Sequence, residues 1–154
     1  MSDFVEKLKF KIGLSGTFHD KKPAFTVSLN GQQHAQDTVQ TESDEIFYVE
    51  FETELADATI NILQIRLTNK SSQDTVVEDG QIVKDMLLNI KSIEIDDVDL
   101  GSLIWSHSKF HIDNPQKFNG NVVTSLENCV NLGWNGTYQF EFSTPFYIWL
   151  LENI

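Results

Sequence analysis

The chain has 154 residues and a formal net charge of −12, with 23 acidic and 11 basic side chains. Hydrophobic residues make up 40% of it, which excludes a disordered chain and fits one folded domain over residues 1–154. Nucleic acids and anionic membranes attract clustered Lys and Arg, so the acidic balance argues against both partners.

The first strands are predicted from side chains that alternate between apolar and polar. Apolar residues occupy every second position from Leu8 to Leu14, and lysines occupy positions 7, 9 and 11. A period of two is typical of a strand with one buried and one exposed face. The pattern recurs from Phe25 to Leu29 and ends at Asn30-Gly31, a dipeptide that closes tight hairpins. We therefore expect a hairpin whose return strand covers residues 32–35.

Three further strands are predicted over residues 47–52, 60–67 and 86–95. In each of the two longer ones the apolar set changes parity, after Ile62 in the first and after Ile90 in the second. A β-bulge, which inserts one extra residue, would produce such a change. These strands and the turn residues between them predict an all-β fold, a two-sheet antiparallel β-sandwich of jelly-roll-like form.

The last third of the chain is less regular. Residues 101–133 are expected to form long loops, after which alternation returns from Tyr138 to Phe142. An apolar run over residues 146–151 favours a buried last strand, with a short helix as the alternative. This apolar end also favours packing against a neighbouring protein or a second copy in a homo-oligomer.

The cysteine content and the first residues indicate a cytoplasmic product. Cys129 is the only cysteine, which excludes an intrachain disulfide. The segment Met1 to Glu6 lacks the basic and apolar regions of an export signal. No apolar window reaches the length that a membrane-spanning helix needs.

A polar loop between the two longer strands carries the candidate metal ligands. It brings amide and carboxylate oxygens to one end of the predicted sandwich, and Ca²⁺ binds about six to eight such oxygens. The candidate calcium ligands are Asn69, Asp74, Glu78, Asp79 and Asp85. The alternative is that these side chains only solvate the loop and cap its turns.

The same region carries a family resemblance. Asp85 and Leu88 open a strand that ends at Ile93-Glu94-Ile95-Asp96, and Lys70 follows Asn69 ahead of the loop. This arrangement resembles calcium-dependent xylan-binding carbohydrate-binding modules, in which an Asp-Arg-Asn-Leu motif opens such a strand and an Asp takes the place of Lys70. The resemblance implies a β-sandwich that holds a Ca²⁺ ion. It also implies that vicinal hydroxyl groups of a sugar complete the coordination of this ion.

A second, looser resemblance covers the last third of the chain. The segments Ile95–Leu100, Asn128–Gly136 and Thr144–Asn153 are similar to uncharacterised proteins of marine tailed bacteriophages. This resemblance implies a virion component, such as a capsid decoration protein or a tail or fibre accessory domain, that assembles in the host cytoplasm.

Two tryptophans are candidate carbohydrate-binding residues. Trp105 and Trp134 lie in the loop-rich third, and an indole ring packs well on the C–H face of a sugar. A position in the hydrophobic core is the alternative for each of them. Trp149 lies within the apolar run and is expected in the core.

The sequence argues against an enzyme. Acidic neighbours such as Asp96-Asp97 do not predict a glycosidase, because adjacent residues of a strand point to opposite faces. The sequence instead predicts a non-enzymatic binding or assembly module of a bacteriophage particle, which recognises a glycan with calcium as the candidate cofactor. The alternative is a purely structural capsid decoration or tail accessory protein that binds neither sugar nor calcium.

Overall fold

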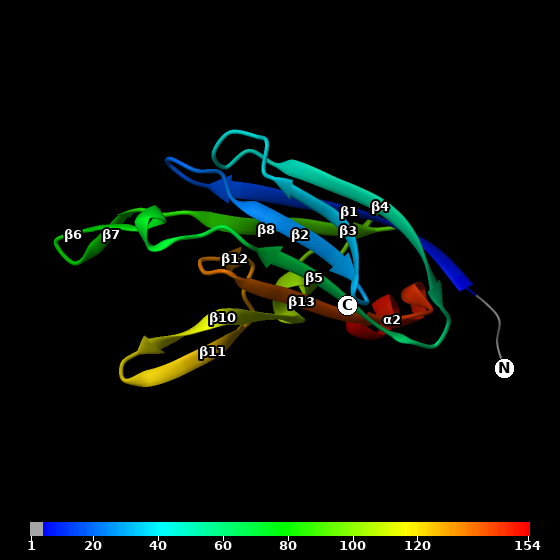
Figure 1. The fold of residues 1–154 in the computed structure, drawn as a ribbon. Coiled ribbons are helices and arrows are strands. Elements are labelled where there is room, and N and C mark those ends of the chain that lie inside the picture. The colour runs from blue at the N-terminus through cyan, green and yellow to red at the C-terminus, as the bar shows by residue number, and fades with distance from the viewer. Residues whose placement is uncertain (1–4) are drawn as a thin grey trace.

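Two antiparallel β-sheets, packed face to face, make up most of the molecule (Figure 1). The computed structural model describes residues 5–154. The first sheet has the strand order β12-β8-β1-β4, with β9 paired to β8; its strands are β1 (Val5–Thr17), β4 (Phe47–Ala56), β8 (Leu87–Ile95), β9 (Val98–Asp99) and β12 (Asn131–Leu132). The predicted two-sheet antiparallel β-sandwich is confirmed.

The second sheet has six strands in the order β11-β10-β13-β5-β2-β3. These strands are β2 (Ala24–Leu29), β3 (Gln32–Thr38), β5 (Ile60–Leu67), β10 (Ser108–Phe118), β11 (Asn121–Glu127) and β13 (Gly136–Ser143). A separate two-stranded hairpin consists of β6 (Val76–Glu78) and β7 (Gln81–Lys84), and the helical segments are η1 (Ser72–Asp74), α1 (Leu103–Ser106) and α2 (Phe146–Asn153).

The predicted hairpin between β2 and β3 is confirmed. Asn30 and Gly31 both have positive φ, 52° and 83°, which is the backbone that a two-residue hairpin turn requires. Asn119 and Gly120 repeat this geometry between β10 and β11. The prediction of long loops over residues 101–133 is therefore wrong for most of that segment, which forms a hairpin and a short helix.

One of the two predicted bulges is present. The register between β1 and β8 shifts beside Lys91, because Gly13 pairs with Ser92 while Leu14 pairs with Ile90. In β5 the prediction is wrong, since that strand pairs with β13 in unbroken register. Ile62 lies on the outer face of β5, and Asn61 takes the inward position.

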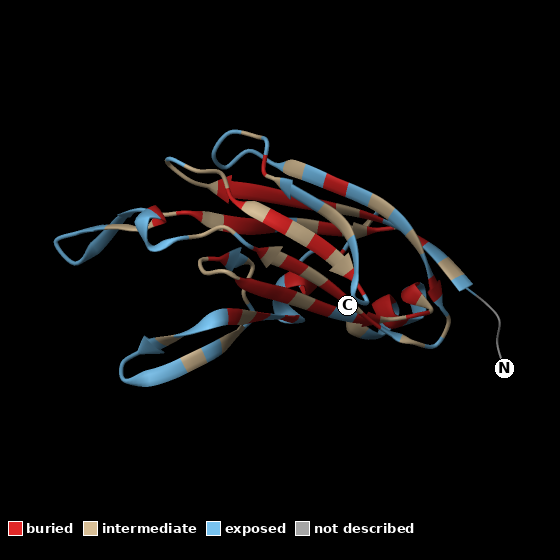
Figure 2. Ribbon diagram, in the orientation of Figure 1, coloured by how far each residue is buried: buried red, intermediate tan, exposed pale blue. Residues whose placement is uncertain are grey.

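The hydrophobic core lies between the sheets and is rich in aromatic side chains (Figure 2). Phe10 of β1 meets Phe142 of β13 across the interface, with ring centroids 6.1 Å apart. Phe10 also stacks on Phe51 of β4, at 4.8 Å. Aromatic rings bury large areas, so they contribute strongly to the stability of a sandwich of this size.

The apolar run at the end of the chain forms helix α2, which is the alternative that the sequence left open, and the favoured buried last strand is wrong. The buried side of α2 includes Trp149, whose ring lies 5.8 Å from that of Phe140 and 6.2 Å from that of Phe142. The prediction of a core position for Trp149 is confirmed, because it is buried. In the part of the chain that the structure describes, no helix has the length and apolar character to cross a membrane.

Two hairpins, β6–β7 and β10–β11, project from one end of the sandwich, opposite α2 (Figure 1). The outer parts of these hairpins are exposed, whereas the strands in the body of the sandwich carry most of the buried residues (Figure 2). The loops at the bases of these hairpins lie at the same end of the molecule (Figure 1).

Candidate functional site

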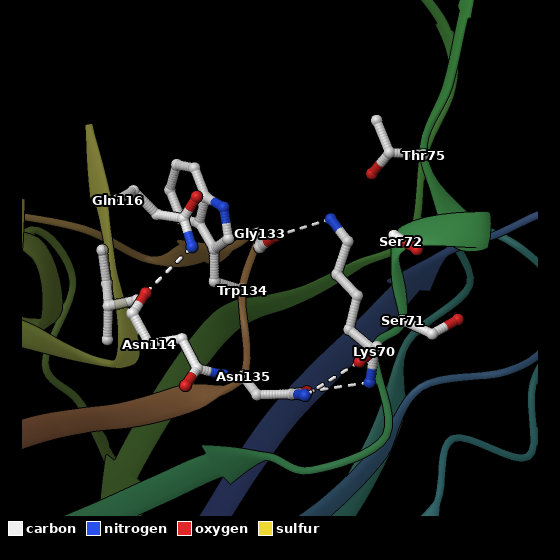
Figure 3. Close-up of a pocket in the computed structure, with 10 residues that line it drawn as sticks. Lys70, Ser71, Ser72, Thr75, Asn114, Gln116, Gly133, Trp134 and Asn135 are labelled. Atoms are coloured by element: carbon white, nitrogen blue, oxygen red, sulfur yellow. Dashed lines mark hydrogen bonds between the residues drawn. The ribbon is translucent and has the colours of Figure 1, made fainter. Parts of the chain in front are cut away.

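A pocket of about 370 Å³ lies at this end, between the bases of the two projecting hairpins. One wall comes from the loop that leads from β5 into β6, and the other comes from β10 and from the segment before β13 (Figure 3). Neutral polar side chains, one indole ring and one lysine dominate its lining, which consists of Lys70, Ser71, Ser72, Thr75, Ile112, Asn114, Gln116, Gly133, Trp134 and Asn135.

Two asparagines hold the loop after β5 in place. The side-chain amide of Asn69 accepts a hydrogen bond from the Ala24 N–H (2.8 Å) and donates one to the Lys22 carbonyl (3.0 Å). The amide of Asn135 bonds the Lys70 N–H and the Lys70 carbonyl, both at 2.8 Å, as a neighbouring strand would. The two walls of the pocket are thus joined by bonds between the Asn135 side chain and the Lys70 backbone.

Lys70 spans the pocket from the loop to the opposite side (Figure 3). Its ammonium group donates to Asp85 Oδ1 at 2.7 Å and to the carbonyl of Gly133. The Lys70 side chain is only 10% exposed and that of Asp85 22% exposed, so solvent screens this ion pair weakly.

Asp85 is held as a carboxylate by three donors on one oxygen. Besides Lys70, the Thr75 hydroxyl (2.7 Å) and the Met86 N–H (2.8 Å) donate to Oδ1. Burial by itself would raise the pKa of Asp85, but the three hydrogen bonds outweigh it and hold that pKa below its usual value.

The opposite wall depends on an irregular stretch of β10. The pairing of β10 with β11 is interrupted between His111 and Gln116, and this interruption places Asn114 and Gln116 at the pocket. The Gln116 amide donates to the Asn114 carbonyl at 2.9 Å. The Trp134 ring stands beside them (Figure 3) and meets the edge of Phe118 at 5.6 Å between centroids.

The structure does not bring the five predicted calcium ligands together. In residues 5–154, no group of three or more His, Cys, Asp or Glu side chains is arranged to hold a metal ion. Asn69 is occupied with backbone groups and Asp85 with Lys70. Glu78 and Asp79 lie exposed at the tip of the β6–β7 hairpin, where Asp79 forms the turn with a φ of 53°.

Asp74, the remaining predicted ligand, is also engaged. Its Oδ2 accepts hydrogen bonds from the Ser71 N–H (2.8 Å) and hydroxyl (3.0 Å) and pairs with Lys21 at 3.0 Å. Burial by itself would raise the pKa of Asp74, but these contacts outweigh burial and hold the pKa below its usual value. Asp74 therefore caps a turn, as the alternative interpretation of the acidic residues expected.

The two predicted sugar-binding tryptophans lie apart. Trp134 lines the pocket, whereas Trp105 belongs to α1 and is 52% exposed. The paired strands β10 and β13 separate them: Ile112 pairs with Gly136 at the Trp134 end, and Ser108 pairs with Phe140 at the Trp105 end. Trp105 and Trp134 therefore cannot act on one sugar ring.

Comparison with known proteins bears on the architecture. No family model and no curated protein matches the chain. A structure of vCBM60 in complex with galactobiose matches with a TM-score of 0.52 and 11% sequence identity, over 86% of this chain and 96% of that chain. A selenomethionine form of vCBM60 matches with a TM-score of 0.55 and 12% identity, over 86% of this chain and 89% of that chain.

The chain shares the fold of vCBM60. The second structure comes from work on circular permutation as a link between two families of calcium-dependent carbohydrate binding modules. The expected resemblance to carbohydrate-binding modules is thus confirmed for the fold. The resemblance to bacteriophage proteins and the virion location stay predictions.

Most of the pocket lining was missed at the level of sequence. Within the vCBM60-like fold, Asn114, Gln116 and Asn135 meet Ser72 and Thr75 only because β13 lies between β10 and β5. Amide and hydroxyl side chains have no characteristic spacing when three separate segments supply them. The one local signal was the concentration of Asn residues with Trp134 after residue 113.

Proposed function

We propose that the protein is a non-enzymatic carbohydrate-binding module that binds a neutral oligosaccharide in the pocket beside Trp134. The observation that carries this proposal is the composition of the pocket, in which one indole ring faces neutral amide and hydroxyl groups. The fold shared with vCBM60, a carbohydrate-binding module that was solved with galactobiose, supports it.

The lining suits the chemistry of a sugar. An indole ring packs on the apolar C–H face of a pyranose, and amides both donate to and accept from its hydroxyl groups. Asn114 and Gln116 supply such amides on the side of Trp134, and Ser71, Ser72 and Thr75 supply hydroxyls on the other side (Figure 3).

The charges around the pocket favour a neutral ligand. Lys70 is the only charged residue of the lining, and its ammonium already pairs with Asp85. The chain as a whole is strongly acidic, with a net charge of −12, so it repels polyanionic glycans at long range.

A glycan array followed by calorimetric titration of its hits tests the proposal. We expect neutral oligosaccharides among the hits and an affinity that falls about tenfold in Trp134→Ala, because burial of apolar surface at about 25 cal/mol per Å² makes the contact of a sugar ring with an indole worth on the order of 1–2 kcal/mol. Gln116→Ala should weaken binding through the loss of an amide while the fold is retained.

Trp105→Ala is the matched control, because it removes an exposed indole at the far end of β10. It should bind as the wild type does. Equal losses in the Trp105 and Trp134 variants, or an array on which no neutral glycan binds, would contradict the proposal. Thermal melting of each variant separates lost binding from lost folding.

Helix α2 supports a second candidate function, in assembly. Its outer side exposes the large apolar residues Tyr147, Ile148 and Leu151, and exposed Ile154 follows directly after the helix. A contiguous exposed apolar patch is a feature of surfaces that contact other proteins. A structural role in a particle, such as a bacteriophage virion, would use this side, and Ile148→Glu should then abolish co-sedimentation of the protein with that particle.

A further inference from the structure

The ammonium of Lys70 lies where two oxygens from different parts of the chain converge. Asp85 Oδ1 comes from the segment before β8, and the Gly133 carbonyl comes from the segment before β13. The Thr75 hydroxyl reaches the same Asp85 oxygen. A carboxylate, a carbonyl and a hydroxyl are the oxygen types that a hard divalent cation takes as ligands.

We infer that the Lys70 ammonium is a built-in cation that replaces a bound metal ion in this pocket, so that the pocket is formed and binds its ligand without calcium. This inference rests on the proposed function only where it concerns the ligand. The claim about the metal stands on the contacts of Lys70 alone.

The donor set does not fit Ca²⁺ in the observed arrangement. Asp85 Oδ1 already receives three hydrogen-bond donors, and one of them carries a full positive charge. A Ca²⁺ ion would need about six to eight oxygens and would have to displace the ammonium from a poorly exposed position. The same charge repels a second cation from the oxygens beside it.

Lys70 also has a donor left for a ligand. An ammonium group carries three N–H bonds, and among the described residues Asp85 and Gly133 accept two of them. Because Lys70 lines the pocket, the third can donate to a sugar hydroxyl. Such a charge-assisted bond is shorter and stronger than one between neutral groups.

The first experiment measures calcium binding without any sugar. We expect no heat when CaCl₂ is titrated into the metal-free wild type, and the same melting temperature in excess calcium as in chelator. Saturable binding, or a melting temperature that calcium raises by about 3 °C or more, would overturn the inference.

The second experiment removes the ammonium. Lys70→Asp adds a carboxylate beside Asp85 and the Gly133 carbonyl, so we expect this variant to melt below the wild type in chelator and to regain stability in calcium. Lys70→Gln is the variant for the case in which Lys70→Asp does not fold, and it should show a smaller response. No calcium response in either variant would show that Lys70 does not occupy a cation position.

Lys21→Gln is the matched control. Lys21 forms the other lysine–aspartate pair of this region, with Asp74 at 3.0 Å, and it is absent from the pocket lining. It should lose stability without losing affinity for the sugar, whereas Lys70→Gln should lose about tenfold or more in affinity.

The sugar titration, run in chelator and in calcium, separates the two claims. Equal affinity in both supports calcium-independent binding. Binding only in calcium would overturn the role of Lys70 and leave the proposed function intact. If no glycan binds in either condition, the proposed function fails, and the sugar-free calcium titration still decides the role of Lys70.

Discussion

At the scale of single residues, the pocket depends on side chains that bond the backbone. Asn69 and Asn135 each use both ends of the amide to hold loop segments, and Asp74 caps a turn through Ser71. The atoms that make these bonds serve the internal structure of the loops. Polar residues in a loop are as often part of its internal structure as of a binding site, because buried backbone groups need partners.

The Asp85 carboxylate predicts how the protein responds to acid. Its pKa in the folded state is below the usual value, so the protonated form favours unfolding, and the stability that this carboxylate provides is present above about pH 4 and is lost as the pH falls through the folded-state pKa. Asp85→Asn should therefore be about 2 kcal/mol less stable near neutral pH and less sensitive to acid below pH 4. Chemical denaturation at a series of pH values measures both effects.

Asp79→Asn is the control for this experiment, because Asp79 lies exposed at the tip of a hairpin. It should keep the acid sensitivity of the wild type. An Asp85→Asn variant that lost stability with falling pH as steeply as Asp79→Asn would show that the Lys70 pair does not control the acid response.

At the scale of elements, alternation and turn residues predicted the strands where each strand has one buried face. The β2–β3 hairpin and the bulge of β8 follow directly from Asn30-Gly31 and from the parity change after Ile90. The bulge expected in β5 is absent because the hydrogen-bonding side chain of Asn61 occupies the inward position that an apolar residue was expected to fill.

For two other elements the favoured prediction was wrong, because tertiary contacts determine their secondary structure. A run of six apolar residues suits a buried strand and a buried helix equally, and α2 is a helix whose Trp149 packs on Phe140 and Phe142. The β10–β11 hairpin was missed because its strands are mostly exposed and polar, which leaves little alternation to detect.

The pairing of β10 with β13 requires a glycine at position 136. A Cβ atom on Gly136 would lie 2.2 Å from the His111 carbonyl oxygen and 2.8 Å from the Phe110 ring. Gly136→Ala should therefore cost about 2–3 kcal/mol and displace the neighbouring Trp134 and Asn135. Gly133→Ala is the matched control, because its Cβ would meet Leu87 at an ordinary 3.4 Å.

Denaturant unfolding of both glycine variants, together with measurement of sugar binding, tests whether position 136 requires a glycine. The Gly136 variant should lose stability and affinity together, while the Gly133 variant should lose little stability. Similar stabilities for the two variants would mean that β10 can shift away from β13 without cost.

At the scale of the whole molecule, the fold was within reach of the sequence, and the site was not. The sheets bring Trp134 to a loop that lies about 60 residues earlier in the chain, at Lys70 to Thr75. The predicted calcium ligands are close in sequence, but the hairpin β6–β7 carries Glu78 and Asp79 away from the pocket. Proximity along the chain was a poor guide because a projecting hairpin separates its tip from its base.

Because the protein carries a net charge of −12, the effect of salt on ligand binding depends on whether the ligand is charged. For a neutral oligosaccharide there is no long-range Coulomb interaction to screen, so we expect the affinity to change by less than about twofold between low and high NaCl concentration. Calorimetric titrations in the two buffers measure it. A steep loss of affinity with added salt would indicate an anionic ligand that binds through Lys70, and would contradict a neutral one.

The pair of hydrogen bonds between the Asn135 side-chain amide and the Lys70 backbone determines which residues of the pocket could change to give a new ligand specificity. Exchange of Asn135 would remove both bonds, and exchange of Lys70 would remove the contacts of its ammonium with Asp85 and Gly133. Asn114, Gln116 and Ser72 border the same space without joining its two walls in this way. Diversification by point mutation should therefore concentrate on these three, and a library randomised there would yield folded variants with altered selectivity far more often than one randomised at Lys70 and Asn135.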